Sequence, residues 1–274
     1  MKSRLNNTES GFTITELLVT IALSLSVVSS VLVGYMATYT SSMDTMAASK
    51  MNQDLNAVMN MMITEFRRAG YSAGAANATD PTTNLFNQVD DTALEVFDSM
   101  AGNNQLVTDL SNGWTNSSSP AATEGSCIVY AYDLDDDGVV DAEELGGFRL
   151  NSGVVEFRRL GNTADPDTCT TSSNTWEALT DSSFITVSEL TFNLDDSACL
   201  NTREPNNVDD DADSTVDNAE EADCYDVAAA SGDITVETRQ INITLTGNLT
   251  ADAFVQISLN QDVRVRNDLV RVRP

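Results

Sequence analysis

The hydrophobic and polar positions of this chain divide it into parts with different periodicity. Apolar residues run almost without a break from Gly11 to about Tyr39, which exceeds the roughly 20 residues that a helix needs to cross a bilayer. From Ser42 to about Arg68 they recur at three- and four-residue steps, a spacing typical of an amphipathic helix. The stripe consists of Met43, Met46, Ala47, Met51, Leu55, Val58, Met59, Met62, Ile63 and Phe66.

The two apolar patterns adjoin, so they predict one helix of roughly 50 residues or more, near 80 Å long at about 1.5 Å per residue. Arg67 and Arg68 in its last turn, followed by Gly70, are helix-ending signals. We expect a sheet to cover the methionine-rich stripe, although an adaptable binding face is the alternative. The expected divisions are therefore 1–11, 12–40, 41–70 and a β-rich head at 71–274.

Short runs of β-forming residues predict the strands of the head. Alternation is clearest in two runs, and Gly247-Asn248 with the acidic stretch around Asp252 predicts a hairpin turn between them. The predicted strands are Ala93–Phe97, Gln105–Asp109, Cys127–Tyr132, Gly147–Leu150, Val154–Leu160, Phe184–Val187, Leu190–Leu194, Ile234–Leu245 and Phe254–Val265. The predicted loops are Ser72–Asn84, Ser111–Gly125 and Ala164–Asn174.

The composition excludes several functions. The formal net charge of −28 argues against binding nucleic acid through a basic surface. The chain has no histidine, which removes histidine-based catalysis and zinc sites. It also lacks a nucleophile motif, and we therefore expect no enzyme.

All four cysteines follow the apolar segment: Cys127, Cys169, Cys199 and Cys224. An even number in an exported domain indicates two disulfides. Three pairings are possible, and the sequence does not decide among them. We favour Cys127–Cys169 with Cys199–Cys224 because each pair would bracket one of two acidic loops, 133–144 and 209–220. The alternative is that some cysteines stay reduced and buried.

The first acidic loop, 133–144, fits the EF-hand calcium loop at each key position. Calcium takes six to eight oxygen ligands, which this spacing wraps around one ion. Gly138 permits the sharp turn, and Val140 would anchor the loop to the core. The predicted ligands are Asp133, Asp135, Asp137, the carbonyl of Val139, Asp141 and Glu144.

A second copy of the loop spans 209–220. Ser214 replaces the glycine, which makes the turn less favourable and predicts a weaker or distorted site. Its predicted ligands are Asp209, Asp211, Asp213, the carbonyl of Thr215, Asp217 and Glu220. Because a strand precedes the first loop, we expect a structural clip rather than a helix-opening switch. The alternative for both loops is an acidic surface.

The N-terminus carries a polar leader with Lys2 and Arg4, then Gly11, Phe12 and Glu16. This arrangement resembles the type III signal of type IV pilins and type II secretion pseudopilins. The resemblance implies that a prepilin peptidase cleaves after Gly11 and methylates Phe12. It also implies that Glu16, expensive in hydrocarbon when unpaired, meets the amine of Phe12 on a neighbouring subunit. A plain membrane anchor is the alternative.

The string R-R-A-G-Y at 67–71 resembles the PilW-type minor pilins. The resemblance implies an α+β type IV pilin fold, with the long helix packed on an antiparallel head. It implies a single-pass inner-membrane protein with a periplasmic head, which then joins other major and minor pilins in an extracellular pilus, near its tip. A J-type secretion pseudopilin and a calcium-dependent adhesin are alternatives, and a membrane-tethered enzyme is the least favoured.

Overall fold

The computed structural model describes residues 11–74, 81–88, 91–97, 124–170 and 173–273. Helix α1 (Ile14–Phe66) has 53 residues, as the apolar patterns predict. The chain separates into two compact units, 1–50 and a head of 51–274, and α1 contributes to both. The signal residues therefore lie in one unit and the acidic loops in the other.

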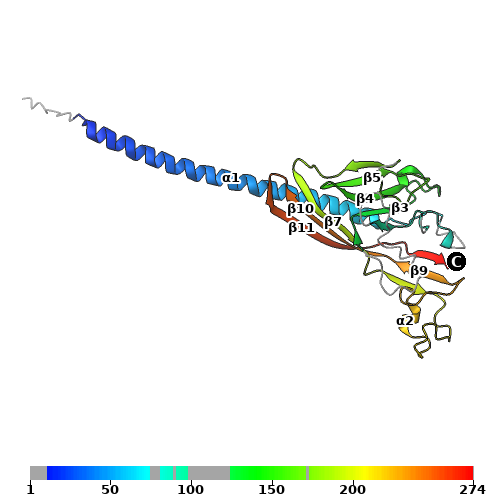
Figure 1. The fold of residues 1–274 in the computed structure, drawn as a ribbon. Coiled ribbons are helices and arrows are strands. Elements are labelled where there is room, and N and C mark those ends of the chain that lie inside the picture. The colour runs from blue at the N-terminus through cyan, green and yellow to red at the C-terminus, as the bar shows by residue number, and fades with distance from the viewer. Residues whose placement is uncertain (1–10, 75–80, 89–90, 98–123, 171–172, 274) are drawn as a thin grey trace, which may run out of the picture. The chain divides into compact units, whose positions relative to one another are not determined.

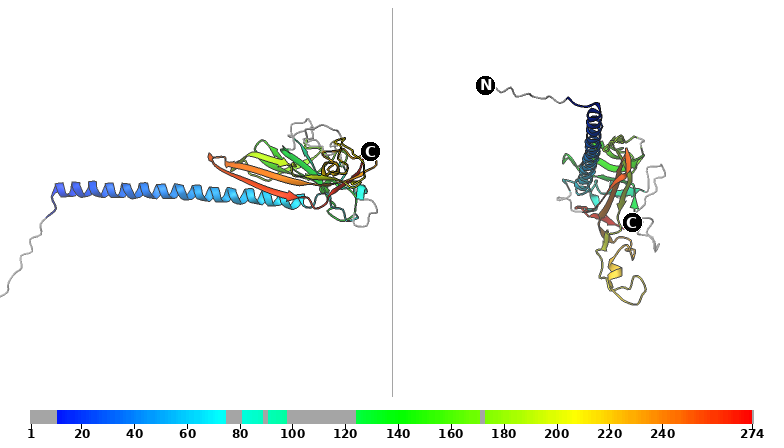
Figure 2. Two further views of the ribbon diagram at one scale, coloured as in Figure 1. Left: turned by 90° about the horizontal axis from the view of Figure 1, so that it is seen from below. Right: turned by 90° about the vertical axis from the view of Figure 1, so that its left-hand side faces the viewer.

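The described part of the head contains three antiparallel sheets (Figures 1 and 2). One has the order β1-β3-β4-β5-β6, the second β11-β10-β7-β2 and the third β12-β9-β8. The strands are β1 (Glu95–Phe97), β2 (Glu124–Gly125), β3 (Cys127–Ala131), β4 (Leu145–Asn151), β5 (Val154–Leu160), β6 (Thr175–Ala178), β7 (Ile185–Asn193), β8 (Ala198–Asn201), β9 (Ile234–Thr238), β10 (Gln240–Leu249), β11 (Asp252–Arg264) and β12 (Leu269–Val272). Three short helices complete the described part of the head: η2 (Pro81–Thr83), η4 (Ala142–Glu144) and α2 (Ala219–Ala222).

The C-terminal part of α1 lies in the core of the head. The ring of Phe66 is fully buried and meets Tyr130, Phe148 and Phe192 edge-on, with ring centres 5.5–5.7 Å apart. These partners come from β3, β4 and β7, so one side chain joins two sheets. The buried residues of α1 are Met51, Leu55, Val58, Met59, Met62 and Phe66.

The methionine-rich stripe is covered only in part. Its residues from Met51 onward are buried as predicted except Ile63, which is half-buried, whereas Met43 and Met46 are exposed. These two precede the head, which begins at residue 51. Helical periodicity shows an apolar face, but it does not show how far the covering sheet extends.

The hairpin of β10 and β11 forms, but its turn differs from the prediction. Gly247 lies within β10, and the turn falls at Thr250 and Ala251. A Cβ on Gly247 would come within 3.2 Å of Ile185 and Leu55. This glycine therefore permits close approach of α1 to the strand rather than a turn.

Two predicted strand boundaries are also wrong. The single run 234–245 is two strands in different sheets, and the chain passes between them at the buried Arg239. Conversely, the two runs at 184–194 form one strand, β7. The exposed Ser188 and Glu189 interrupt the apolar pattern there, beside an irregularity in the pairing with β10. A bulge thus mimics a strand break in the sequence.

The strands that prediction missed are β2, β6, β8 and β12, and each is at the edge of its sheet. Edge strands have one neighbour and tolerate polar residues, so they lack a clear apolar pattern. Arg271 of β12 forms an ion pair with the buried Glu237 of β9. The predicted strand 105–109 and the loop 111–125, up to β2, lie outside the described residues.

Two disulfides, Cys127–Cys169 and Cys199–Cys224, connect the four cysteines in the favoured pairing. Their Cα atoms are 6.4 and 5.2 Å apart. The first tethers β3 to the segment between β5 and β6, and the second tethers β8 to the segment after α2. Each disulfide brackets one acidic loop in the sequence. The loop with α2 projects from the body of the head (Figures 1 and 2).

Candidate metal centre

The first acidic loop connects β3 to β4 and folds through local carboxylate bonds. The amide of Asp137 donates to Asp135 Oδ1 at 3.3 Å, and that of Val139 donates to Asp137 Oδ1 at 2.7 Å. Asp136 and Gly138 have φ of 65° and 74°. Gly138 therefore takes the left-handed conformation that the motif requires of a glycine.

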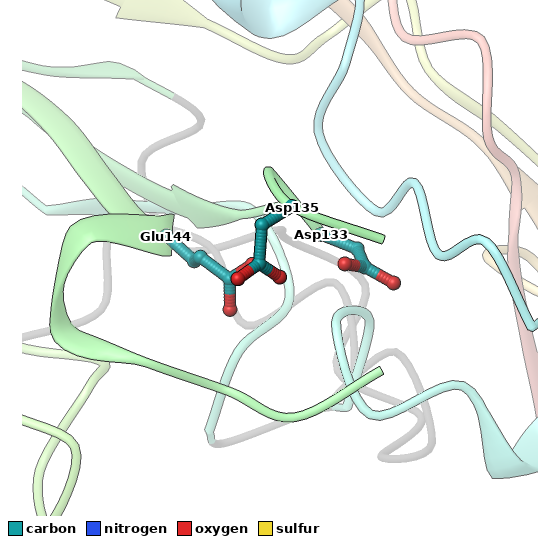
Figure 3. A group of neighbouring side chains, drawn as sticks. All are labelled: Asp133, Asp135 and Glu144. Carbon is teal, nitrogen blue, oxygen red and sulfur yellow. The ribbon is translucent and has the colours of Figure 1, made fainter. Parts of the chain in front are cut away.

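Three acids of this loop form a cluster, which Figure 3 shows. One carboxylate oxygen from each of Asp133, Asp135 and Glu144 lies within 4.8 Å of the others. Asp133 and Glu144 are each 2% exposed, whereas Asp135 is exposed. Among the described residues, Asp137 and Asp141 lie outside this cluster. The structure therefore assembles positions one, three and twelve of the predicted ligand set.

Glu144 closes the loop as the twelfth residue. Its two oxygens accept the amides of Leu134 at 2.7 Å and Asp141 at 2.9 Å. Burial raises the pKa of Glu144, and the charges of Asp133 and Asp135 raise it further, while the two amides oppose the shift. A cation beside the three carboxylates would favour the charged form of Glu144 and so lower its pKa.

Asp133 supplies an observation beyond loop shape that points to a cation. Its Oδ2 accepts the amide of Ala73 at 3.1 Å, but its buried Oδ1 has no hydrogen-bond partner within the described chain. Buried polar atoms are usually paired. A hard cation with oxygen ligands, such as calcium, fits this donor set.

Val140 packs against the buried cluster of Phe86, Ala131 and Leu145. The predicted apolar anchor is therefore present in the first loop. Its counterpart in the second loop, Val216, is 51% exposed. The first loop is thus fixed to the core by its own side chain, whereas the second is tethered at its base by Cys199–Cys224.

The second loop repeats the local bonds of the first up to its seventh position. The amide of Asp213 donates to Asp211 Oδ1 at 2.9 Å, and that of Thr215 donates to Asp213 Oδ1 at 2.6 Å. Positive φ recurs at Ala212 and Ser214, at 62° and 76°. Ser214 therefore adopts the left-handed conformation that favours glycine. The prediction of a weaker site rests on the cost of this conformation for a residue with a Cβ.

The two loops differ in how they close. In the second, Glu221 accepts the amides of Asp210 at 2.6 Å and Asn218 at 3.1 Å, which repeats the bonds of Glu144. Glu221 is 1% exposed, whereas the predicted Glu220 is exposed. The residue equivalent to Glu144 is therefore Glu221, in a loop one residue longer. The capping box Asn218-x-x-Glu221 is the sequence signal for it.

The acids of the second loop form three overlapping groups. In each, one oxygen per residue lies within 4.8 Å of the others. The groups are Asp209, Asp211 and Glu221; Asp211, Asp213 and Glu220; and Glu204, Asp217 and Glu221. The predicted carboxylates are thus divided among three groups instead of forming one, and Asp217 lies with Glu204 and Glu221 rather than with another predicted ligand. Burial raises the pKa of the Glu204 carboxyl.

The signal residues lie at the start of α1 in the other unit. Gly11 and Phe12 are exposed and precede the helix. Glu16 accepts both the amide of Thr13 at 3.0 Å and its hydroxyl at 2.8 Å, so the carboxylate caps the first turn of its own helix. Within the described residues, α1 is the one helix long and apolar enough to cross a membrane.

A long apolar N-terminal helix that continues into an antiparallel, disulfide-bonded head is the layout of a pilin-like protein. Comparison with protein families agrees with this class. A family model described as prepilin peptidase-dependent protein B matches residues 44–265, and the chain belongs to that family. No curated protein and no solved structure gives a significant match. The family match begins after Glu16, so the signal residues are a separate observation.

Proposed function

We propose that this protein is a minor pilin of the PilW type, which enters a type IV pilus through its N-terminal helix and helps to start or stabilise the fibre near its tip. The observation that carries the proposal is the family match over 44–265 on a chain whose α1 can span a membrane. The spacing of Gly11, Phe12 and Glu16 supports it independently.

In this function the apolar half of α1 holds the subunit in the inner membrane before assembly, with the head in the periplasm. A prepilin peptidase removes residues 1–11 and methylates Phe12. Glu16 then exchanges its bonds to Thr13 for the amine of Phe12 on a neighbouring pilin. An ion pair of this kind satisfies a carboxylate that hydrocarbon disfavours.

Processing and location test this function together. We expect the purified protein to begin at N-methylated Phe12, and Gly11→Val to keep the whole leader, as measured by intact-protein mass spectrometry. The wild-type chain should appear in filaments sheared from the cell surface. A chain that is processed but confined to the envelope would instead support a J-type secretion pseudopilin, which shares the signal residues. An unprocessed wild-type chain would contradict both.

Calcium in the first loop is the second part of the proposal. The cluster of Asp133, Asp135 and Glu144 supports it, together with Asp133 Oδ1, which has no hydrogen-bond partner in the described part of the chain. The ion would act as a structural clip between β3 and β4. Extracellular calcium modules bind at about 10⁻⁴ to 10⁻³ M, a range suited to a protein outside the cytoplasm.

The second loop, as a weaker calcium site, yields a prediction about its closing acid. We expect Glu221→Gln to lower the bound calcium from two ions to one in isothermal titration of the full chain in detergent micelles. Glu220→Gln is the matched control, because it removes the same charge one residue away from an exposed position. It should leave two ions bound. Loss of one ion in Glu220→Gln but not in Glu221→Gln would mean that Glu220 closes the loop at its twelfth position, as the sequence predicts.

A further inference from the structure

The segment that follows α1, residues 70–73, contacts the first acidic loop through its main chain. The amide of Ala73 donates to Asp133 Oδ2 at 3.1 Å, and the amide of Asp133 donates to the carbonyl of Tyr71 at 2.9 Å. Ala73 and Asp133 are 60 positions apart in sequence. Asp133 therefore belongs to the loop and also bonds to residues 70–73. We call residues 70–73 the junction.

Two further bonds hold the junction. The amide of Gly70 donates to the carbonyl of Ala131, the last residue of β3, at 2.8 Å. The hydroxyl of Tyr71 donates to Asp136 Oδ1, inside the loop, at 3.2 Å. Four bonds thus connect the junction to β3 and the loop, and two of them end on loop carboxylates. Two of the four bonds therefore depend on where the loop carboxylates lie.

The carboxylate of Asp133 has two different oxygens. Oδ2 is held by Ala73, while Oδ1 is buried and has no hydrogen-bond partner in the described residues. The side chain is buried, and an unpaired buried oxygen beside two other carboxylates disfavours this arrangement. Because both oxygens belong to one carboxylate, an opening that moves this group to bring Oδ1 to water would also move Oδ2 away from the amide of Ala73. A cation bound to Oδ1 would pair this oxygen and so remove the energetic cost that favours opening.

We propose that a hard divalent cation, calcium by its ligand chemistry, acts through Asp133 as a lock that holds the junction, the segment directly after α1, on β3 and the first loop. The cation binds Oδ1 and thereby holds Oδ2 on the amide of Ala73. The end of α1 is then fixed to β3 when calcium is abundant and released locally when it is scarce. This inference rests on the calcium site of the proposed function.

Hydrogen exchange of the full chain in detergent micelles tests the lock. Calcium chloride at about 100 times its dissociation constant, measured by titration of the same sample, raises the ratio of closed to open junction about 100-fold if only the closed form binds. Exchange of the amides of Gly70, Ala73 and Asp133 should slow by up to that factor relative to chelator. The ladder between β7 and β10 provides reference amides that should not change.

Two variants separate the lock from an ordinary loss of stability. Asp135→Asn removes a cluster carboxylate that has no hydrogen bond to the junction among the described residues. It should abolish the calcium-dependent slowing at Gly70 and Ala73. Glu143→Gln removes one charge from the same loop at an exposed residue outside the cluster. It should retain the slowing.

The outcomes distinguish this inference from the proposed function. Slowing at the junction in the wild-type chain and in Glu143→Gln, but not in Asp135→Asn, supports the lock. Calcium binding that slows only amides of 134–141 overturns the lock and leaves the structural calcium site standing. Slowing that persists in Asp135→Asn also overturns it, because the effect would not depend on the cluster. Failure to bind calcium overturns both the lock and the site, while assembly through α1 is measured separately.

Discussion

Calcium bound in the first loop should by itself raise the melting temperature of the full chain in detergent micelles by roughly 5–10 °C over the value in chelator. Cation at about 100 times its dissociation constant adds about 2.7 kcal/mol per site that only the folded state binds. Each kcal/mol corresponds to about 2–4 °C for a domain of this size. The head contains both acidic loops, so the shift should appear in its unfolding transition, followed by circular dichroism.

The calcium-induced difference for each variant is the quantity to compare, rather than the melting temperature itself. Glu144 also accepts two loop amides, so Glu144→Gln should lower the melting temperature in chelator as well. We expect Asp135→Ala combined with Glu144→Gln to remove the first loop's share of the shift. Glu143→Gln should retain it. An equal shift in the double variant would contradict the assignment of this loop as a site.

Magnesium and monovalent salt separate coordination from charge screening. Magnesium demands near-octahedral geometry and gives up its water reluctantly, so the same concentration should give a smaller shift. Potassium chloride at matched ionic strength screens the repulsion of the acids without entering the cluster. The chain has a net charge of −28, so screening alone could stabilise it. A shift equal in all three salts would show screening rather than a calcium site.

The long helix and the central strands could be predicted because periodicity directly reports burial. The face of α1 that includes Met51, Leu55 and Phe66 is covered by sheet, and its three- and four-residue spacing is visible in the sequence. The missed strands are short edge strands such as β6, whose residues are mostly exposed, and β8, which has only four residues. Their pairing depends on the neighbouring strand, which local sequence does not show.

The cluster of Asp133, Asp135 and Glu144 in the first loop was predictable because these positions follow a fixed spacing within twelve residues, whereas the predicted Asp137 and Asp141 lie outside that cluster among the described residues. The acid that closes the second loop was not predictable, because Glu220 and Glu221 are adjacent and the fixed spacing selects Glu220. The fold instead buries Glu221, because Asn218 and Asp210 direct their amides to its carboxylate. The bond from Ala73 to Asp133 also escapes prediction, because it joins residues that come together only in the folded head.

Replacing Glu16 by valine should reduce incorporation into surface filaments by more than about 100-fold, since removing one partner of a buried ion pair costs about 3–5 kcal/mol. In the proposed filament the lost carboxylate leaves the amine of Phe12 on the adjacent subunit unpaired in an apolar core. The amount of the chain in sheared filaments, relative to the amount in membranes, measures the effect.

Membrane insertion and cleavage should survive the change from Glu16 to valine, because the apolar run becomes longer and Gly11 and Phe12 are untouched. Asp44→Asn is the matched control, since it removes one carboxylate from the exposed face of the same helix beyond the apolar run. The calcium-induced shift should be unchanged in both variants, because Glu16 belongs to the unit that contains no acidic loop. Wild-type filament levels in Glu16→Val would mean that the carboxylate serves its own helix through Thr13 and not a neighbour. Assembly would then rest on apolar packing of α1 alone.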